Sequence, residues 1–231
     1  KYLQKKISKN KIFTHSLQSL NGAEYNLNKK NFFKPNKDSQ KKIEKVFNLK
    51  ISEIKNSINI CIRKRNNKYI NFDRTNYLRD GNVLNFKTVI NYLLKNYNYK
   101  LFITGDVDEL DIKHKNLYNY KKFSKKISRG FYQLSIQTLS KFHIMNSGGG
   151  NSIVRFNNGC KTLYIDCWPP INFQQNSIVL YKNIFDKKNN YIDSLEYLKM
   201  YEKECSKQKN KNSFKVSRDI FLKFFEAKKY R

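Results

Sequence analysis

Four short apolar runs in the middle of the chain are rich in β-branched residues and predict buried strands. They are SINICI (57–62), YKLFIT (99–104), HIM (143–145) and KTLYIDC (161–167). Apolar residues at helical spacing predict helices over 82–97 and 131–142, and a short helix over 152–159 follows a glycine-rich turn. This alternation predicts an α/β fold, a Rossmann-like parallel sheet with helices on both faces.

Polarity divides the chain into three parts. Residues 1–56 are rich in lysine and asparagine, with one amphipathic helix over about 38–49, and are expected to be a connector or the tail of an N-terminal domain. Residues 57–190 hold the predicted sheet. In residues 191–231, two predicted helices, over 191–207 and 217–230, are expected to pack back on the sheet domain. Because the chain begins with a lysine, we expect it to be part of a longer protein.

Composition changes this picture only in part. The net charge of +29 invites a nucleic-acid interpretation, but the lysines are spread along the whole chain and only 8 of the 47 basic residues are arginine. Abundant lysine, asparagine, isoleucine and tyrosine are typical of an AT-rich genome. We therefore expect no nucleic acid as the primary partner. The cysteines form no CxxC pair and are expected to be buried thiols of a cytoplasmic protein.

Unusual residues follow each predicted strand. Arg63 and Arg65 follow the first strand, and Arg74 and Arg79 lie in the same segment. The other strands are followed by the stretches Gly105-Asp106, 147–150 and 166–170. In parallel sheets of this type, ligands bind beyond the carboxyl ends of the strands. Because guanidinium groups bind phosphate oxygens two at a time, the arginines predict an anion site at this edge. Surface ion pairing is the alternative interpretation.

The turn SGGGNS (147–152) holds three of the chain's 8 glycines. Glycines between a strand and a helix let a ligand approach the backbone, and the helix that follows offers N–H groups to a phosphate. The candidate contacts are Ser147, Gly148, Gly149 and Asn151. A turn needed only for packing is the alternative. The stretch fits neither GxxxxGK[ST] nor GxGxxG, which disfavours a P-loop NTPase and a nicotinamide dehydrogenase.

The order of these segments resembles the C-terminal half of a GT-B glycosyltransferase. More narrowly, it is similar to a family of bacterial glycosyltransferases of the surface-polysaccharide type, distantly fucosyltransferase-like. Four stretches carry the resemblance across roughly residues 58–198. They are NICIRKRNN, YLRDGNVLNFKTVINYLLKNYNYKLFITGD, LSKFHIMNSGGGNSIVRFNNGCKTLYID and IVLYKNIFDKKNNYIDSLEYL. Two departures stand out, because Gln133 replaces an aspartate usual in the family and the turn has three glycines instead of one.

The resemblance implies an enzyme that transfers a sugar from a nucleotide diphosphate sugar to a glycan or lipid-linked acceptor. It implies that Arg63, Arg79, Ser147 and Gly148 contact the donor diphosphate, without a metal or other cofactor. Arg65, Asp106 and Asp166 are further candidates for sugar or nucleotide contacts. The catalytic base is expected from the other domain. Attachment to the inner face of the membrane fits a lipid-linked acceptor.

Other candidate sites carry less weight. Asp106-Val107-Asp108 has the letters of a metal-binding DxD triplet but is interpreted as a solvated loop. The histidines have no carboxylate or cysteine at metal-ligand spacing, and His143, inside an apolar run, is expected to be structural. A non-catalytic basic nucleic-acid- or nucleotide-binding module remains the alternative function. Nucleic-acid binding would need aromatic and basic residues interleaved on one exposed face.

Overall fold

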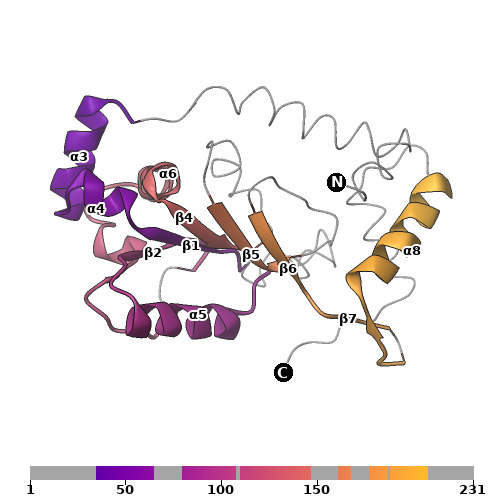
Figure 1. Ribbon diagram of the computed structural model, residues 1–231. Coiled ribbons are helices and arrows are strands. Elements are labelled where there is room, and N and C mark those ends of the chain that lie inside the picture. The colour runs from indigo at the N-terminus through magenta and orange to yellow at the C-terminus, as the bar shows by residue number, and fades with distance from the viewer. Residues whose placement is uncertain are drawn as a thin grey trace. The chain divides into compact units, whose positions relative to one another are not determined.

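A computed structural model of the chain describes residues 35–64, 80–107, 110–146, 161–167, 177–186 and 188–207. In these residues a six-stranded sheet has the order β3-β2-β1-β4-β5-β6 (Figure 1). Its strands are β1 (Ile58–Ile62), β2 (Leu101–Gly105), β3 (Leu117–Tyr118), β4 (Phe142–Met145), β5 (Lys161–Cys167) and β6 (Ser177–Tyr181). β1 pairs in parallel with β2 and β4, and the pairs β2–β3 and β4–β5 are also parallel. The predicted Rossmann-like α/β sheet is confirmed.

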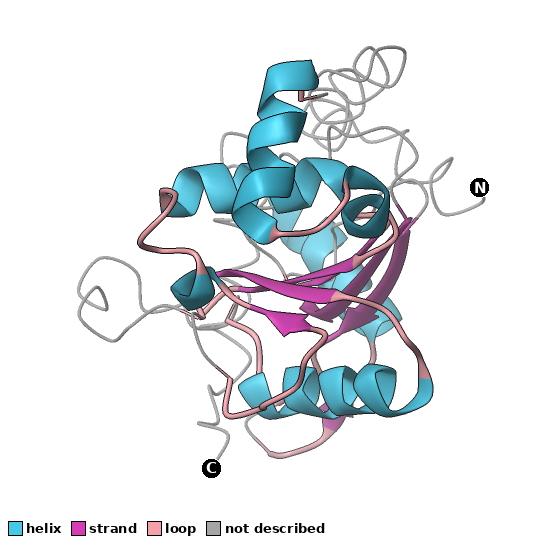
Figure 2. Ribbon diagram, turned by 90° about the vertical axis from the view of Figure 1, so that its left-hand side faces the viewer, coloured by secondary structure: helices cyan, strands magenta, loops and turns pink. Residues whose placement is uncertain are grey.

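Helices cover both faces of the sheet (Figure 2). α5 (Val83–Asn96) lies on one face, where the isoleucines of β1 pack against Phe86 and Ile90. This core is almost entirely aliphatic. Since successive side chains of a strand point to opposite faces, the same strands present a second, different set of residues to the other side. That alternation is what lets one short strand contribute to both cores.

The opposite face has an aromatic core beneath α3 (Lys37–Phe47), α4 (Ile51–Lys55) and α6 (Arg129–Leu139). The ring of Phe47 lies 4.6 Å from that of Phe123 and 5.8 Å from that of Phe102. Tyr132 of α6 is fully buried, and its hydroxyl donates to the carbonyl of Ile103 at 3.0 Å. α3 and α4 lie before the domain boundary predicted at residue 57, and their apolar residues belong to this core.

Capping residues fix where the helices begin. Asn82 caps α5 by accepting from the N–H of Leu84 at 3.0 Å, so the observed helix agrees with the predicted 82–97. Ser128 accepts from the N–H of Phe131, and α6 therefore begins at Arg129, two residues before the predicted start. α6 ends at Leu139, and Phe142 opens β4 instead of closing the helix.

The described residues divide into two compact units near the end of β6. The first unit runs to Leu180 and includes, beside the elements above, the 3-10 helix η3 (Tyr120–Lys122). The second contains the antiparallel pair β7 (Ile184–Phe185) and β8 (Tyr191–Ile192), followed by α8 (Ser194–Lys207). None of the described helices combines the length and the apolar character that crossing a bilayer requires.

Candidate functional site

The strand order places a topological switch point between β1 and β4. The chain leaves β1 through α5 to reach β2 on one side, and later returns through α6 to β4 on the other side. Helices on opposite faces therefore diverge at the carboxyl ends of β1 and β4. Doubly wound sheets with this strand order bind ligands in the crevice formed there. The residues that follow the two strands are Arg63 and Asn146.

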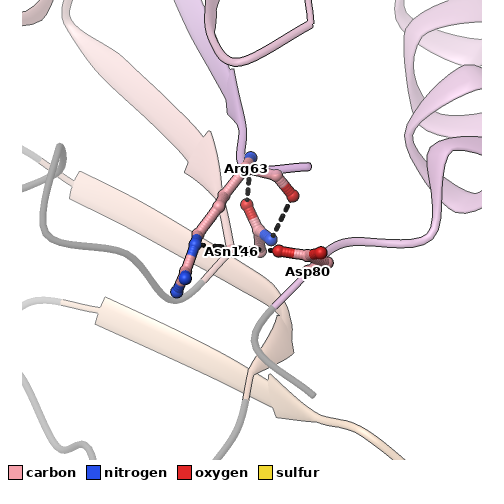
Figure 3. Close-up of polar contacts among 3 residues, drawn as sticks. All are labelled: Arg63, Asp80 and Asn146. Carbon is pink, nitrogen blue, oxygen red and sulfur yellow. Dashed lines mark hydrogen bonds and ion pairs between the residues drawn. The ribbon is translucent and has the colours of Figure 1, made fainter. Parts of the chain in front are cut away.

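Arg63 is a buried cation at this switch point. It is only 8% exposed, and its Nε lies 3.7 Å from Oδ1 of Asp80. Asp80 precedes the start of α5, so the pair joins the end of β1 to the segment that leads into the helix. In Figure 3 the carboxylate faces Nε, and the two terminal nitrogens of the guanidinium lie farther from it. A charge in such a site interacts more strongly with an anion than a solvated charge does.

The main chain of Arg63 is held by the side chain of Asn146. Asn146 Oδ1 accepts from the N–H of Arg63 at 2.8 Å, and Nδ2 donates to the Arg63 carbonyl at 3.1 Å (Figure 3). The same carbonyl also accepts from the N–H of Gly81 at 2.9 Å. Asn146 was not among the predicted site residues. A polar residue at the end of an apolar strand, directly before a glycine turn, is the signal in the sequence that marks it.

Asp166, at the end of β5, contacts the start of α5. Its carboxylate accepts from the N–H of Asn82 at 2.7 Å and from Nδ2 of Asn85 at 2.9 Å. Its φ of 53° is unusual for a non-glycine residue. A carboxylate at a helix N-terminus interacts favourably with the helix dipole. Asp166 thus ties β5 to α5, while its predicted contact with a sugar or nucleotide stays a prediction.

At the end of β2, Gly105 turns the chain away from the sheet. Its φ is 93°, and a Cβ at this position would meet the carbonyl oxygen of Ile62 in the neighbouring strand. The Gly105 carbonyl accepts from Arg129 at 3.2 Å and from Gln133 Nε2 at 3.0 Å. Gln133, the residue that departs from the family pattern, is therefore engaged with the sheet edge. Asp106, a predicted contact, is exposed beside it.

The remaining predicted contacts lie outside the described residues. They are Arg65, Arg79, Ser147, Gly148, Gly149 and Asn151. Two of them adjoin described site residues in the sequence, since Arg79 precedes Asp80 and Ser147 follows Asn146. The described part of the site therefore brings together Arg63, Asp80 and Asn146, with Asp166 on the neighbouring strand.

A second polar network lies deeper, between the sheet and α6. Thr104 donates to Asn59 Oδ1 at 2.7 Å, so Asn59 presents its Nδ2 to His143 Nδ1 at 3.1 Å. His143 Nδ1 must then accept, which places the ring proton on Nε2. Burial lowers the pKa of His143 to about 4, although a hydrogen bond with the Ser140 backbone acts in the opposite direction. This histidine is neutral and structural.

The cysteines of the sheet are buried thiols, as the sequence predicts for Cys61 and Cys167. Burial raises the pKa of Cys61 to about 11, and Gln137 Nε2 lies 3.9 Å from its sulfur. A thiol with so high a pKa is not a nucleophile at neutral pH. Among the described residues, no group of three or more histidine, cysteine, aspartate or glutamate side chains could hold a metal ion.

Comparison of the chain with models of known protein families, with curated proteins and with solved structures finds no match.

Proposed function

We propose that this chain is the nucleotide-sugar-binding part of a cytoplasmic glycosyltransferase. The donor is a nucleotide diphosphate sugar, and the acceptor is a glycan or a lipid-linked glycan. The observation that supports this most is the buried Arg63 at the switch point between β1 and β4, fixed through both its main chain and its guanidinium. The order of the quoted sequence segments supports the enzyme class.

The chemistry of sugar transfer explains why a buried arginine is useful here. When the bond between the sugar and the diphosphate breaks, negative charge grows on the departing phosphate oxygens. A cation that is already in place stabilises this charge without reorganising, and a guanidinium can bind two oxygens in parallel. In this proposal Arg63 supplies that cation, together with Arg79 and the serine–glycine turn. The catalytic base comes from a domain that binds the acceptor.

A thermal-shift panel tests this proposal. Nucleotide sugars and nucleoside diphosphates are expected to raise the melting temperature, because a ligand that binds only the folded state stabilises it. The response should disappear in Arg63→Ala and persist in Lys64→Ala, since Lys64 is an exposed cation next to it in the chain. Arg63→Lys keeps the charge but loses the bidentate geometry, so about tenfold weaker binding is expected. An equal response of wild type and Arg63→Ala would contradict the proposal.

A second candidate function rests on the opposite, amino edge of the sheet. Three exposed tyrosines in contact lie there, Tyr92, Tyr97 and Tyr99, with ring centroids 6.1 Å apart in each adjacent pair. Lys100 and Lys141 lie at the same edge, because the Lys100 carbonyl accepts from Ile58 N–H and Lys141 N–H donates to Ser57. Interleaved aromatic and basic residues are typical of single-strand nucleic-acid binding.

This candidate predicts a different response. An oligonucleotide should bind with an affinity that falls steeply as salt rises, since each phosphate contact releases a counterion. Substitution of Tyr97 and Lys141 by alanine should weaken that binding, and Arg63→Ala should leave it unchanged. Binding that is insensitive to salt, or to both amino-edge substitutions, would contradict this second function.

A further inference from the structure

The side chain of Asn146 takes the place of a main chain. The parallel ladder between β1 and β4 runs from Ile58↔Phe142 to Cys61↔Met145 and ends there. One step beyond, both backbone groups of Arg63 still have partners on the β4 side, but these are the Oδ1 and Nδ2 atoms of Asn146. A primary amide has an acceptor and a donor in one plane, as a peptide group does. The ladder is thus extended by a side chain while the main chain of β4 is released.

The contact extends from Arg63 to the segment before α5. Gly81 donates to the Arg63 carbonyl, and a Cβ at Gly81 would lie 3.0 Å from Nδ2 of Asn146 and 2.7 Å from the ring of Phe86. Only glycine therefore lets this segment close over the amide without displacement. Asp80, the preceding residue, is placed by that closure against Nε of Arg63. Asn146 thus bears on both ends of Arg63, its main chain and the carboxylate that orients its guanidinium.

We propose that Asn146 is a positioning residue, which sets where the Arg63 guanidinium lies and thereby the affinity of the site for a diphosphate. This inference rests on the proposed function. The role requires an acceptor and a donor at once. An aspartate has the same shape and accepts from the Arg63 N–H, but its second oxygen would face the Arg63 carbonyl, where two acceptors repel each other. Asn146→Asp is therefore the sharpest substitution.

Asn59 provides a matched control. Both asparagines are fully buried, and both join β1 to β4, but Asn59 binds the side chains of Thr104 and His143 and has no contact with Arg63. Asn59→Ala and Asn146→Asp are both expected to lower stability. Only Asn146→Asp should weaken binding of a nucleoside diphosphate, by about tenfold, because the hydrogen bonds that place a charged group are lost. If Asn146→Asp does not fold, Asn146→Ser, which can make only one of the two bonds, replaces it.

Two readouts on the full chain separate this inference from the proposed function. The first is the dissociation constant for a nucleoside diphosphate, measured below the melting temperature of every variant. The second is the ¹⁵N–¹H signal of Arg63 Nε, recorded without ligand. A shifted Nε signal and weaker binding in Asn146→Asp, with both near wild type in Asn59→Ala, is the expected result.

An Nε signal and an affinity in Asn146→Asp equal to wild type would overturn the positioning role, as would equal losses of affinity in both variants. If the wild type binds no diphosphate, the proposed function fails. The Nε signal then still decides the placement of Arg63: a shift in Asn146→Asp alone supports positioning, and no shift overturns it.

Discussion

Two buried asparagines connect the same pair of strands and do different work. Asn59, in the middle of β1, hydrogen-bonds the side chains of Thr104 and His143 across three strands. Asn146, at the end of β4, hydrogen-bonds the main chain of Arg63. The first network closes on itself between the sheet and α6. The second lies at the edge and leads to a cation.

The difference shows how position along a strand decides what a buried polar group is for. In the middle of the sheet the backbone groups are already paired by the ladder, so a buried amide can bind only side chains, and it favours one arrangement of the strands. At the end of the ladder the backbone groups need new partners, and an amide that supplies them fixes the chain at that point. The carboxyl edge is thereby rigid where a ligand would bind.

The largest expected effect breaks the carboxyl edge. Gly105→Ala requires a positive φ and places a Cβ against the Ile62 carbonyl, so we expect a loss of about 4 kcal/mol in the free energy of unfolding. Urea unfolding measures it. The control is Gly130→Ala in α6, where no atom lies within 4 Å of the added Cβ and a helical alanine stabilises slightly. A tolerated Gly105→Ala would show that the edge is not held as described.

A smaller effect separates the middle network from the edge. Because the pKa of His143 is about 4 in the folded protein and 6.5 in the unfolded chain, the unfolded state binds more protons between these pH values. Stability is therefore present above pH 6.5 and is lost as pH falls toward 4, by about 3 kcal/mol from this group.

The comparison with His143→Gln isolates this contribution, since acid also protonates carboxylates whose pKa values are lowered, such as Glu53 and Asp186. The free energy of unfolding, measured by urea at several pH values, should fall less steeply in the variant than in the wild type. Identical slopes would mean that His143 accepts a proton in the folded protein at its ordinary pKa.

The smallest effect concerns the tie between β5 and α5. Asp166→Asn removes the charge at the N-terminus of α5 and one of the two accepted hydrogen bonds, for an expected loss of about 1 kcal/mol. Asp193→Asn is the control, because Asp193 caps α8 and asparagine caps a helix as well as aspartate does. Urea unfolding of both variants gives the comparison, and equal losses would remove the special role of Asp166.

Much of the sheet can be predicted from the sequence. The apolar runs place β1, β2, β4 and β5, and the apolar spacing places α5 to within a residue. The two-residue strands β3, β7 and β8 are too short to leave a periodic signal, and tertiary pairing alone defines them. The end of α6 was predicted three residues too late, since Leu139 and Phe142 keep helical spacing although Ser140 is already extended.

The candidate site is less predictable for a definite reason. Arg63 is identified because it follows an apolar strand, and parallel strands end at one edge. Asn146 depends on which strand is the neighbour of β1. That neighbour is β4, which lies more than eighty positions away in the sequence, and only the strand order reveals it. A side chain that replaces a peptide group has no spacing rule of its own.

The central claim is that a diphosphate binds at the carboxyl ends of β1 and β4. The most direct measurement is a titration of the ¹⁵N-labelled chain with a nucleotide diphosphate sugar, followed by the backbone amide signals. The account predicts that the largest shifts occur at Arg63, Gly81 and Asn146, and that Lys100 and Lys141 at the amino edge stay unchanged. Shifts confined to the amino edge, with Arg63 unmoved, would contradict it.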